Sequence, residues 1–490
     1  ISQHLLSRAQ MRLKFEEFFY MQMQLVLKNV QRKQKIKGHV FEKIGINFHQ
    51  FFEKHLTFEL TKAQKRVVKE IRMDMGTGRQ MNRLLQGDVG SGKTIVALLL
   101  MLIAIDNGFQ ACLVAPTEIL AQQHYHSLSE QLEALQIPVA LLTGSTSKKE
   151  RQALHEGLNN GKIPILIGTH AVLEDTVQFN KLGLAIIDEQ HRFGVAQRSK
   201  LWKKNELPPH ILVMTATPIP RTLAMSVYGD LDLSVIDELP PGRKKIKTLH
   251  RTDSNRLKVF AFVKEQIALG RQIYVVYPLI QESSKLDYKD LMDGYESLSR
   301  SFPLPDYQIS IVHGQMKSED KAYEMQRFID GKTQIMVATT VIEVGVNVPN
   351  ASVMIIESAE RFGLSQLHQL RGRVGRGADQ SYCILMTGQK RSQESQIRME
   401  TMVKTNDGFQ IAEVDLKLRG PGNIMGTQQS GILQFKIADI IKDQSLLKAA
   451  RERALKILKE DPSLKHPDHQ CIKKTLAALS FDSNIWNFIS

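Results

Sequence analysis

The feature that most constrains the fold is a glycine-rich segment, residues 87–94, that follows a short apolar run and precedes a longer one at residues 95–104. It consists of Gly87, Asp88, Val89, Gly90, Ser91, Gly92, Lys93 and Thr94. Glycines let a backbone curl until several N–H groups point at one anion, and the N-terminus of a following helix adds unpaired donors. The pattern predicts a strand, a phosphate-binding loop and a helix, with Lys93 at the outer phosphates of a nucleoside triphosphate and Thr94 at Mg²⁺. A glycine-rich turn that holds no ligand is the alternative.

The size and charge of the chain narrow the class of protein. Its 490 residues, 42% of them hydrophobic, are enough for two or three domains. The net charge of +14 favours a polyanionic partner, without separating DNA from RNA or a membrane surface. Three distant cysteines argue against zinc and disulfides and for a reducing compartment, and the longest apolar run is too short to span a bilayer. Because Ile1 already lies in a helical pattern, we expect a fragment without its N-terminal part.

The order of patterns along the chain predicts tandem α/β domains with parallel sheets. Residues 1–37 read as a long helix with a basic end, which is either a solvated face or a nucleic-acid contact. Apolar β-rich runs then alternate with helical stretches on both sides of a proline-rich linker at residues 240–245. We expect a connector helix region, a nucleotide-binding domain, a second α/β domain and a helical C-terminal region, at residues 1–56, 57–243, 244–390 and 391–490.

A pair of acids, Asp188 and Glu189, follows an apolar strand pattern at residues 184–187. Parallel sheets place their ligands at the carboxyl ends of the strands, so both acids should lie beside the phosphate-binding loop. We expect Asp188 to hold Mg²⁺ through its water shell and Glu189 to position and deprotonate the attacking water. Paired acids at a strand end also cap helices, which is the alternative that the loop at residues 87–94 disfavours.

Two further segments suit the same nucleotide. Phe58 and Gln64 could clamp adenine, the ring by stacking and the amide by pairing with the edge of the base, although a core phenylalanine and a surface glutamine would look the same. Thr215 and Thr217 end another strand pattern near the same sheet edge. Their expected role is to relay the state of the nucleotide to the second domain.

The second domain supplies a glycine- and arginine-rich segment, residues 369–377. Glycines leave its arginines free to project, and a planar guanidinium can pair with two phosphate oxygens as charge develops. We assign Gln369, Arg373 and Arg376 to catalysis, with Arg376 and then Arg373 as the arginine fingers. An exposed loop on a nucleic-acid backbone is the alternative.

Taken in order, these motifs resemble superfamily 2 helicases, in which two RecA-like domains enclose ATP, and within them the RecG family of DNA translocases. The closer match rests on residues 188–195, 215–222, 341–346 and 366–373. The resemblance implies an ATP- and Mg²⁺-dependent DNA helicase that remodels branched or duplex DNA at stalled forks and recombination junctions. It also implies a bacterial cytoplasmic protein associated with the nucleoid, no membrane, and single-stranded DNA-binding protein as a family partner.

The resemblance further implies a helical hairpin and loop at residues 405–431 that converts closure into movement. Loops with free N–H and hydroxyl groups should contact DNA phosphates without reading sequence, so that binding weakens steeply with salt. The residues assigned to DNA binding and coupling are Thr117, Gly144, Ser145, Thr169, His170, His191, Thr215, Thr217, Thr339, Thr340 and Arg419.

Two departures and three rival functions stay open. Asn347 stands where relatives frequently have Asp, and the N-terminal wedge domain of the family has no counterpart in this chain. A transcription-repair-coupling translocase shares several motifs but typically has a second Glu where this chain has Gln190. An RNA helicase uses the same core, and a nucleotide-gated nucleic-acid binding module would bind without unwinding.

Overall fold

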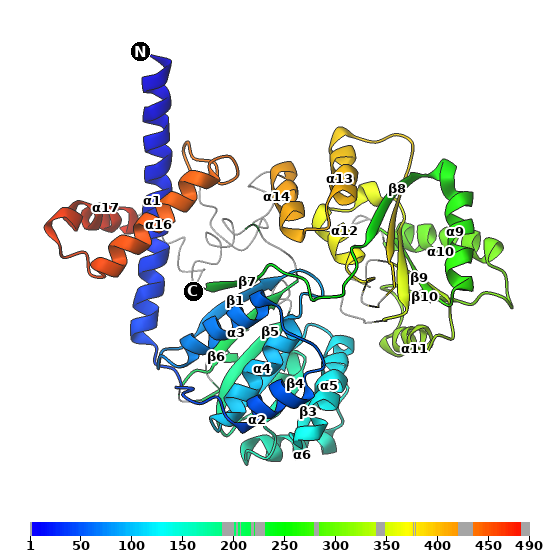
Figure 1. Cartoon of the computed structure of the whole chain (residues 1–490), viewed down its shortest axis with the longest axis horizontal. Helices are drawn as coiled ribbons and strands as arrows, with labels where there is room; N and C mark the ends of the chain where they lie inside the picture. Colours follow the sequence, from blue (N-terminus) through cyan, green and yellow to red (C-terminus); the bar gives the residue numbers. More distant parts are fainter. Residues whose placement is uncertain are drawn as a thin grey trace.

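The computed structural model describes residues 2–188, 200–201, 204–205, 207–216, 220, 231–278, 284–339, 348–375, 377, 379–419 and 435–481. Two α/β domains lie next to each other, and a helical part built on the long N-terminal helix stands beside the first of them (Figure 1). Within the described residues, no helix combines the length and apolar character needed to cross a membrane.

The first domain is a seven-stranded sheet in the order β3-β4-β2-β5-β6-β1-β7, in which all neighbouring strands pair in parallel. Its strands are β1 Asn82–Gly87, β2 Gln110–Val114, β3 Val139–Leu142, β4 Ile165–Gly168, β5 Leu182–Asp188, β6 His210–Thr215 and β7 Asp232–Ile236. Its helices are α2 Ile46–Gln50, η1 Phe51–His55, α3 Lys62–Met75, α4 Lys93–Asp106, α5 Glu118–Leu132, η2 Glu133–Leu135, α6 Lys148–Asn159 and η3 His170–Leu173.

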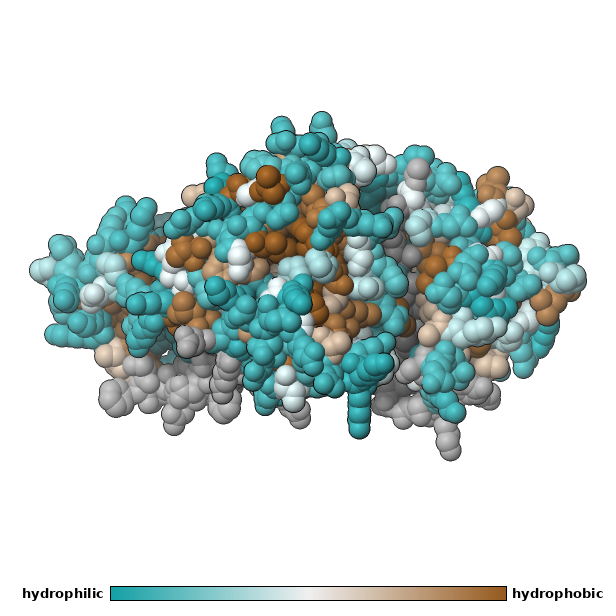
Figure 2. Space-filling model, turned by 90° about the horizontal axis from the view of Figure 1, so that it is seen from below, coloured by the Kyte–Doolittle hydropathy of each residue, from teal (hydrophilic) through white to brown (hydrophobic). Residues whose placement is uncertain are grey.

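Helix α4 forms the centre of this domain, because it is apolar on nearly every side and is buried along most of its length. It begins at Lys93, within the last two residues of the glycine-rich segment, so the core itself anchors the loop. Seen from below, the surface is mostly hydrophilic, with apolar residues gathered near the middle (Figure 2). Phe58 is among the exposed large apolar residues of this domain, with 48% of its surface accessible.

The second domain is a six-stranded sheet in the order β10-β11-β9-β12-β13-β8, again parallel throughout. Its strands are β8 Lys247–Thr252, β9 Gln272–Tyr277, β10 Ile309–Val312, β11 Ile335–Thr339, β12 Ala351–Ile356 and β13 Tyr382–Thr387. Its helices are η5 Asp253–Asn255, α9 Arg256–Ala268, α10 Ser284–Ser301, α11 Ser318–Ile329, η7 Ala359–Arg361 and α12 Leu364–Arg371.

The two sheets repeat one topology. If β8 is matched to β1, and each following strand to the next, the order β10-β11-β9-β12-β13-β8 reproduces β3-β4-β2-β5-β6-β1, and β7 is an extra edge strand of the first domain. The predicted tandem arrangement is therefore confirmed. Strands β3, β7 and β8 were not predicted. None of the three is buried along its whole length, β3 and β7 are the two edges of the first sheet, and β8 is an edge of the second.

The remaining helices form two groups. Helix α1 Gln3–Lys35 packs against α16 Gln444–Glu460 around a core that includes Phe18, Met23 and Leu447. The C-terminal end continues through η8 Pro467–His469 and α17 Gln470–Phe481. The helices α13 Gln393–Lys404 and α14 Gly408–Arg419 pack on each other and on α12, and this pair is called the hairpin (Figure 1). Only α14 falls within residues 405–431, the range predicted for the hairpin and loop, and residues 420–431 lie outside the described part of the chain.

Candidate active site

The glycine-rich segment has the conformation that a phosphate-binding loop requires. Gly90 and Gly92 have φ angles of +72° and +86°, which favour glycine, and Gly92 precedes the first residue of α4. Lys93 Nζ donates to the carbonyl oxygens of Gly87 and Asp88, both at 2.9 Å, so the ammonium group lies within the curve of the loop. Ser91 Oγ is buried there without a hydrogen-bond partner among the described residues. These features fit a bound triphosphate, with Thr94 in the first turn of α4 as the hydroxyl for Mg²⁺.

The other predicted first-domain residues converge on the same sheet edge. Asp188 ends β5 and Thr215 ends β6, the strand that lies between β5 and the loop-bearing strand β1. Asp188 is buried, and its Oδ2 lies 3.0 Å from Nε2 of His124 on α5. The sequence analysis missed His124, whose only signal was its place on an amphipathic helix.

Gln64 lies against the loop. Its side chain is almost fully buried, Nε2 donates to the Ser91 carbonyl oxygen at 2.9 Å, and Oε1 accepts from the Thr61 backbone N–H. Thr61 accepts in return from the Gln64 backbone, which makes a capping box at the start of α3. Gln64 therefore joins the helix start to the loop, and its pairing with adenine stays a prediction, as does stacking by the exposed Phe58.

The second domain meets the loop through α12 and the turn that follows it. His368 Nε2 lies 2.6 Å from Asp88 Oδ1. Gly372 faces Val89 so closely that a Cβ atom there would lie 2.7 Å from the Val89 Cβ. Arg373 is buried in this turn and Gln369 is half-buried on α12, whereas Arg376 lies outside the described residues. The two halves of the predicted site are thus in contact.

Asp88 is the electrostatic centre of this contact. Its Oδ1 accepts from the Val89 backbone N–H at 2.6 Å as well as bonding His368. Burial raises the pKa of Asp88. The hydrogen bonds from His368 and Val89 and the charge of Lys93 lower it by more than burial raises it, so the pKa lies below its usual value. The carboxylate is therefore ionised at neutral pH.

A polar chain runs from the loop to the helical hairpin. Arg371 Nη2 lies 3.0 Å from His368 Nδ1, and because arginine only donates, Nδ1 accepts and Nε2 carries the proton directed at Asp88. Arg371 Nη1 donates to the carbonyl oxygens of Met402 and Thr405, both at 2.9 Å, at the turn between α13 and α14. Both residues lie within residues 366–373, a motif that carried the family resemblance without a predicted role for either of them.

A residue of the linker also reaches the loop. Arg243 Nη1 donates to the Val89 carbonyl oxygen at 2.6 Å, and its Nε donates to the Gly375 carbonyl oxygen at 3.0 Å. Burial lowers the pKa of Arg243, and the negative charge of Asp88 opposes that shift. Residues 240–245 were predicted only as a linker, since composition alone does not reveal which of its cations turns inward.

Some residues predicted to contact DNA lie together. Thr117 caps α5, and the adjacent Glu118 accepts from the backbone and the hydroxyl of Ser145, both at 3.2 Å, which joins these two loops beside Gly144. Thr169 and Thr339 are buried at strand ends, and His170 is exposed. Several predicted residues lie outside the described parts of the chain: Glu189, Gln190, His191, Thr217, Thr340, Asn347, residues 420–431 and the side chain of Arg419.

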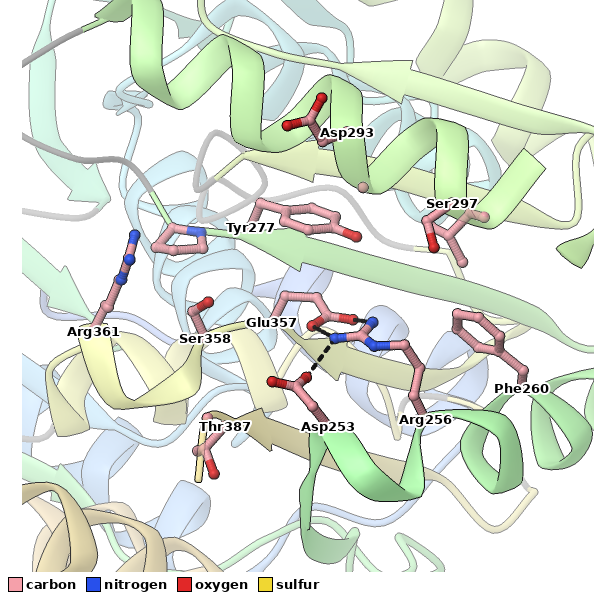
Figure 3. A pocket seen from close by; sticks show the side chains of 14 residues that line it. Asp253, Arg256, Phe260, Tyr277, Asp293, Ser297, Glu357, Ser358, Arg361 and Thr387 are labelled. Carbon is pink, nitrogen blue, oxygen red and sulfur yellow. Dashed lines mark hydrogen bonds and ion pairs between the residues drawn. The ribbon is translucent and has the colours of Figure 1, made fainter. Parts of the chain in front are cut away.

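The second domain holds its own pocket at the carboxyl ends of β8, β9, β12 and β13, with a volume of about 340 Å³ (Figure 3). By the matching strand order it corresponds to the nucleotide site of the first domain. Arg256 begins α9 and pairs with both oxygens of Glu357, at 2.7 and 2.9 Å, and with Asp253 at 2.7 Å. The hydrogen bonds with Glu357 raise the pKa of Arg256 despite burial. The turn before α9 has no glycine, and in place of a phosphate loop the pocket has the mutually paired side chains of Asp253, Arg256 and Glu357.

Comparison with known proteins agrees with this geometry. Residues 61–226 match the DEAD/DEAH box helicase family, residues 258–378 the helicase conserved C-terminal domain, and residues 405–490 the C-terminal part of domain 3 of the ATP-dependent DNA helicase RecG. Tandem RecA-like domains with a nucleotide loop in the first and an arginine-rich turn in the second define a superfamily 2 helicase core.

Individual relatives narrow the class. The chain is 50% identical over 464 residues to the ATP-dependent DNA helicase RecG of Synechocystis sp., covering 94% of this chain and 55% of the relative. It is 47% identical to RecG of Bacillus subtilis, covering 96% and 68%. A solved structure of RecG bound to a three-way DNA junction superposes with a TM-score of 0.74 at 44% identity, covering 90% and 57%. The chain belongs to the RecG family of ATP-dependent DNA helicases, and it spans between about half and two thirds of the length of these relatives.

Proposed function

We propose that this chain is the motor of an ATP-dependent DNA translocase that remodels branched DNA. The observation that carries the proposal is the direct contact between the phosphate-binding loop and the second domain, through Asp88 and His368 at 2.6 Å. A site divided between two domains ties nucleotide binding and release to their relative movement.

Within this proposal the first domain binds the nucleotide. The loop N–H groups and Lys93 would hold the phosphates, and Thr94, with Asp188 through water, would hold Mg²⁺, which would supply positive charge to the phosphate groups. Glu189 positions the attacking water, as the family resemblance implies. Arg373 and Arg376 approach from the second domain as charge develops on the transferred phosphoryl group.

Coupling to DNA runs through the hairpin. Arg371 joins His368 to the turn between α13 and α14, so a shift of α12 against the loop is passed to that turn. Ser365 on α12 also donates to Asp415 on α14 at 2.9 Å, which holds the second hairpin helix to the same element. Movement on duplex DNA, and remodelling of forks and junctions, is the output that this linkage and the RecG relatives support.

Three experiments test the proposal. Lys93→Ala should abolish ATP hydrolysis measured with a branched DNA substrate, while the variant keeps its melting temperature; normal turnover would refute the site. Stimulation of ATPase by a three-way junction, linear duplex and single-stranded RNA separates a DNA motor from an RNA helicase. Displacement of a triplex-forming strand separates a translocase from a module that binds DNA without moving.

A further inference from the structure

The linker between the two sheets contributes a side chain to the ATP site. The chain leaves the first sheet at Ile236 and enters the second at Lys247, and Arg243 lies between them. Its neighbours Lys244 and Lys245 are exposed, and the Lys245 carbonyl oxygen accepts from Gln380 Nε2 at 2.8 Å, whereas the Arg243 guanidinium is enclosed where the domains meet. One cation of a basic run has therefore been turned inward.

The two hydrogen bonds of Arg243 join the halves of the site directly. One goes to Val89 in the phosphate-binding loop, and the other goes to Gly375 in the turn that carries the predicted arginine fingers. A planar guanidinium can hold two acceptors in a set geometry, which an ammonium group on a flexible stem does less well. The distance between loop and turn is therefore set in part by Arg243.

The same contact orients the loop. In a trans peptide the C=O and N–H groups point in opposite directions, so holding the Val89 carbonyl oxygen toward Arg243 turns the Gly90 N–H away from it. This N–H makes no backbone hydrogen bond within the described part of the chain, which leaves it as a donor for an anion. A Cβ at Gly90 would lie 2.1 Å from Arg243 Nη1, so a side chain at this position would displace the guanidinium from the loop.

We propose that Arg243 is a positioning residue for ATP hydrolysis, which sets the arginine-bearing turn against the phosphate-binding loop and holds the loop in its anion-binding conformation. The inference rests on the proposed ATPase function and extends it to the linker. Because Arg243 bonds backbone atoms of both domains, its loss should affect the arrangement needed for the transition state more than the binding of ATP.

Steady-state ATPase with saturating branched DNA tests this role. Arg243→Ala should lower kcat by about tenfold to a hundredfold, as expected for misplaced catalytic groups, and should change the KM for ATP by less than about threefold. Arg243→Lys should recover only part of the loss, because it cannot hold both carbonyl oxygens in the same geometry. Lys244→Ala, at the exposed neighbouring position, is the matched control and should have wild-type kinetics.

The outcomes separate the inference from the proposed function. A wild-type kcat in Arg243→Ala, or a raised KM with unchanged kcat, overturns the positioning role. Loss of turnover in Lys93→Ala would then show that the ATP site itself is correctly assigned. If the melting temperature shows that Arg243→Ala does not fold, Arg243→Lys decides, and a wild-type kcat in that variant overturns the role. Turnover that survives Lys93→Ala refutes the ATP site itself.

Discussion

The hydrogen bond between Asp88 and His368 should be worth enough to detect in ATPase kinetics. Its length of 2.6 Å and the ionised state of Asp88 make it a charge-assisted bond, and both side chains are largely enclosed. Hydrogen bonds to charged groups contribute about 1.5–3 kcal/mol. If this bond contributes about 2 kcal/mol, its removal should change the equilibrium constant between closed and open domains by roughly thirtyfold.

A double-mutant cycle isolates this term from the other bonds of both residues. His368→Ala, Asp88→Asn and the double variant are compared with wild type in kcat/KM for ATP at saturating branched DNA. Asp88→Asn keeps Oδ1 as an acceptor for the Val89 N–H, so the loop should retain its shape, but it removes the negative charge that faces His368, so the cycle measures the charge-assisted part of the bond. The exposed His126→Ala is the control for loss of a histidine.

We expect each single variant to lose about tenfold or more in kcat/KM, and the double variant to lose little beyond the worse single one. A coupling energy below about 0.5 kcal/mol, with the single losses simply adding, would mean that the bond does not hold the domains together during turnover. That result would refute the argument that the divided site couples closure to hydrolysis.

Three further measurements follow from particular residues. Titration with a nucleotide should find one site per chain, because the corresponding pocket of the second domain has the paired Arg256 and Glu357 in place of a phosphate loop; two sites of similar affinity would contradict this. Gly168→Ala should destabilise the first domain by about 1–3 kcal/mol in denaturant unfolding, since its Cβ would lie 2.1 Å from the Leu142 carbonyl oxygen, while Gly314→Ala, with open space around it, should be neutral. Burial lowers the pKa of His210 to about 4, so the free energy of unfolding should fall as the pH drops from about 6.5 toward 4, because the unfolded chain takes up a proton that the folded chain excludes. The total loss is on the order of 3 kcal/mol. If His210→Gln has the same pH dependence of stability as the wild type, the prediction is wrong.

Much of the architecture could be predicted because its causes are local. Strand β5 was predicted at residues 184–187, within two residues of both of its ends, since buried parallel strands are continuous apolar runs. The loop at residues 87–94 was recognised because glycine positions and the following apolar helix are properties of neighbouring residues. Strand β8 could not be found in this way, because its sequence is polar and it pairs only with β13 at the sheet edge.

The active site was predicted only in its parts. Sequence patterns assigned Lys93, Thr94 and Asp188 to one sheet edge, where the structure has them. They did not indicate that His124 would contact Asp188, or that His368 rather than a neighbouring residue of its motif would reach the loop. These pairings depend on how helices and domains pack, which spacing along the chain does not encode.

The sequence by itself determined which chemistry is available: a loop that binds phosphates, acids at a strand end and arginines on a glycine-rich turn, all defined by residues close to one another in the chain. Only the tertiary structure decided which of these groups meet. Asp88 and His368 are separated by 280 positions, and Arg243 reaches both domains because the linker folds back between them. Contacts of this kind arise from the docking of two separately folded sheets, where small changes in orientation select one side chain over its neighbour.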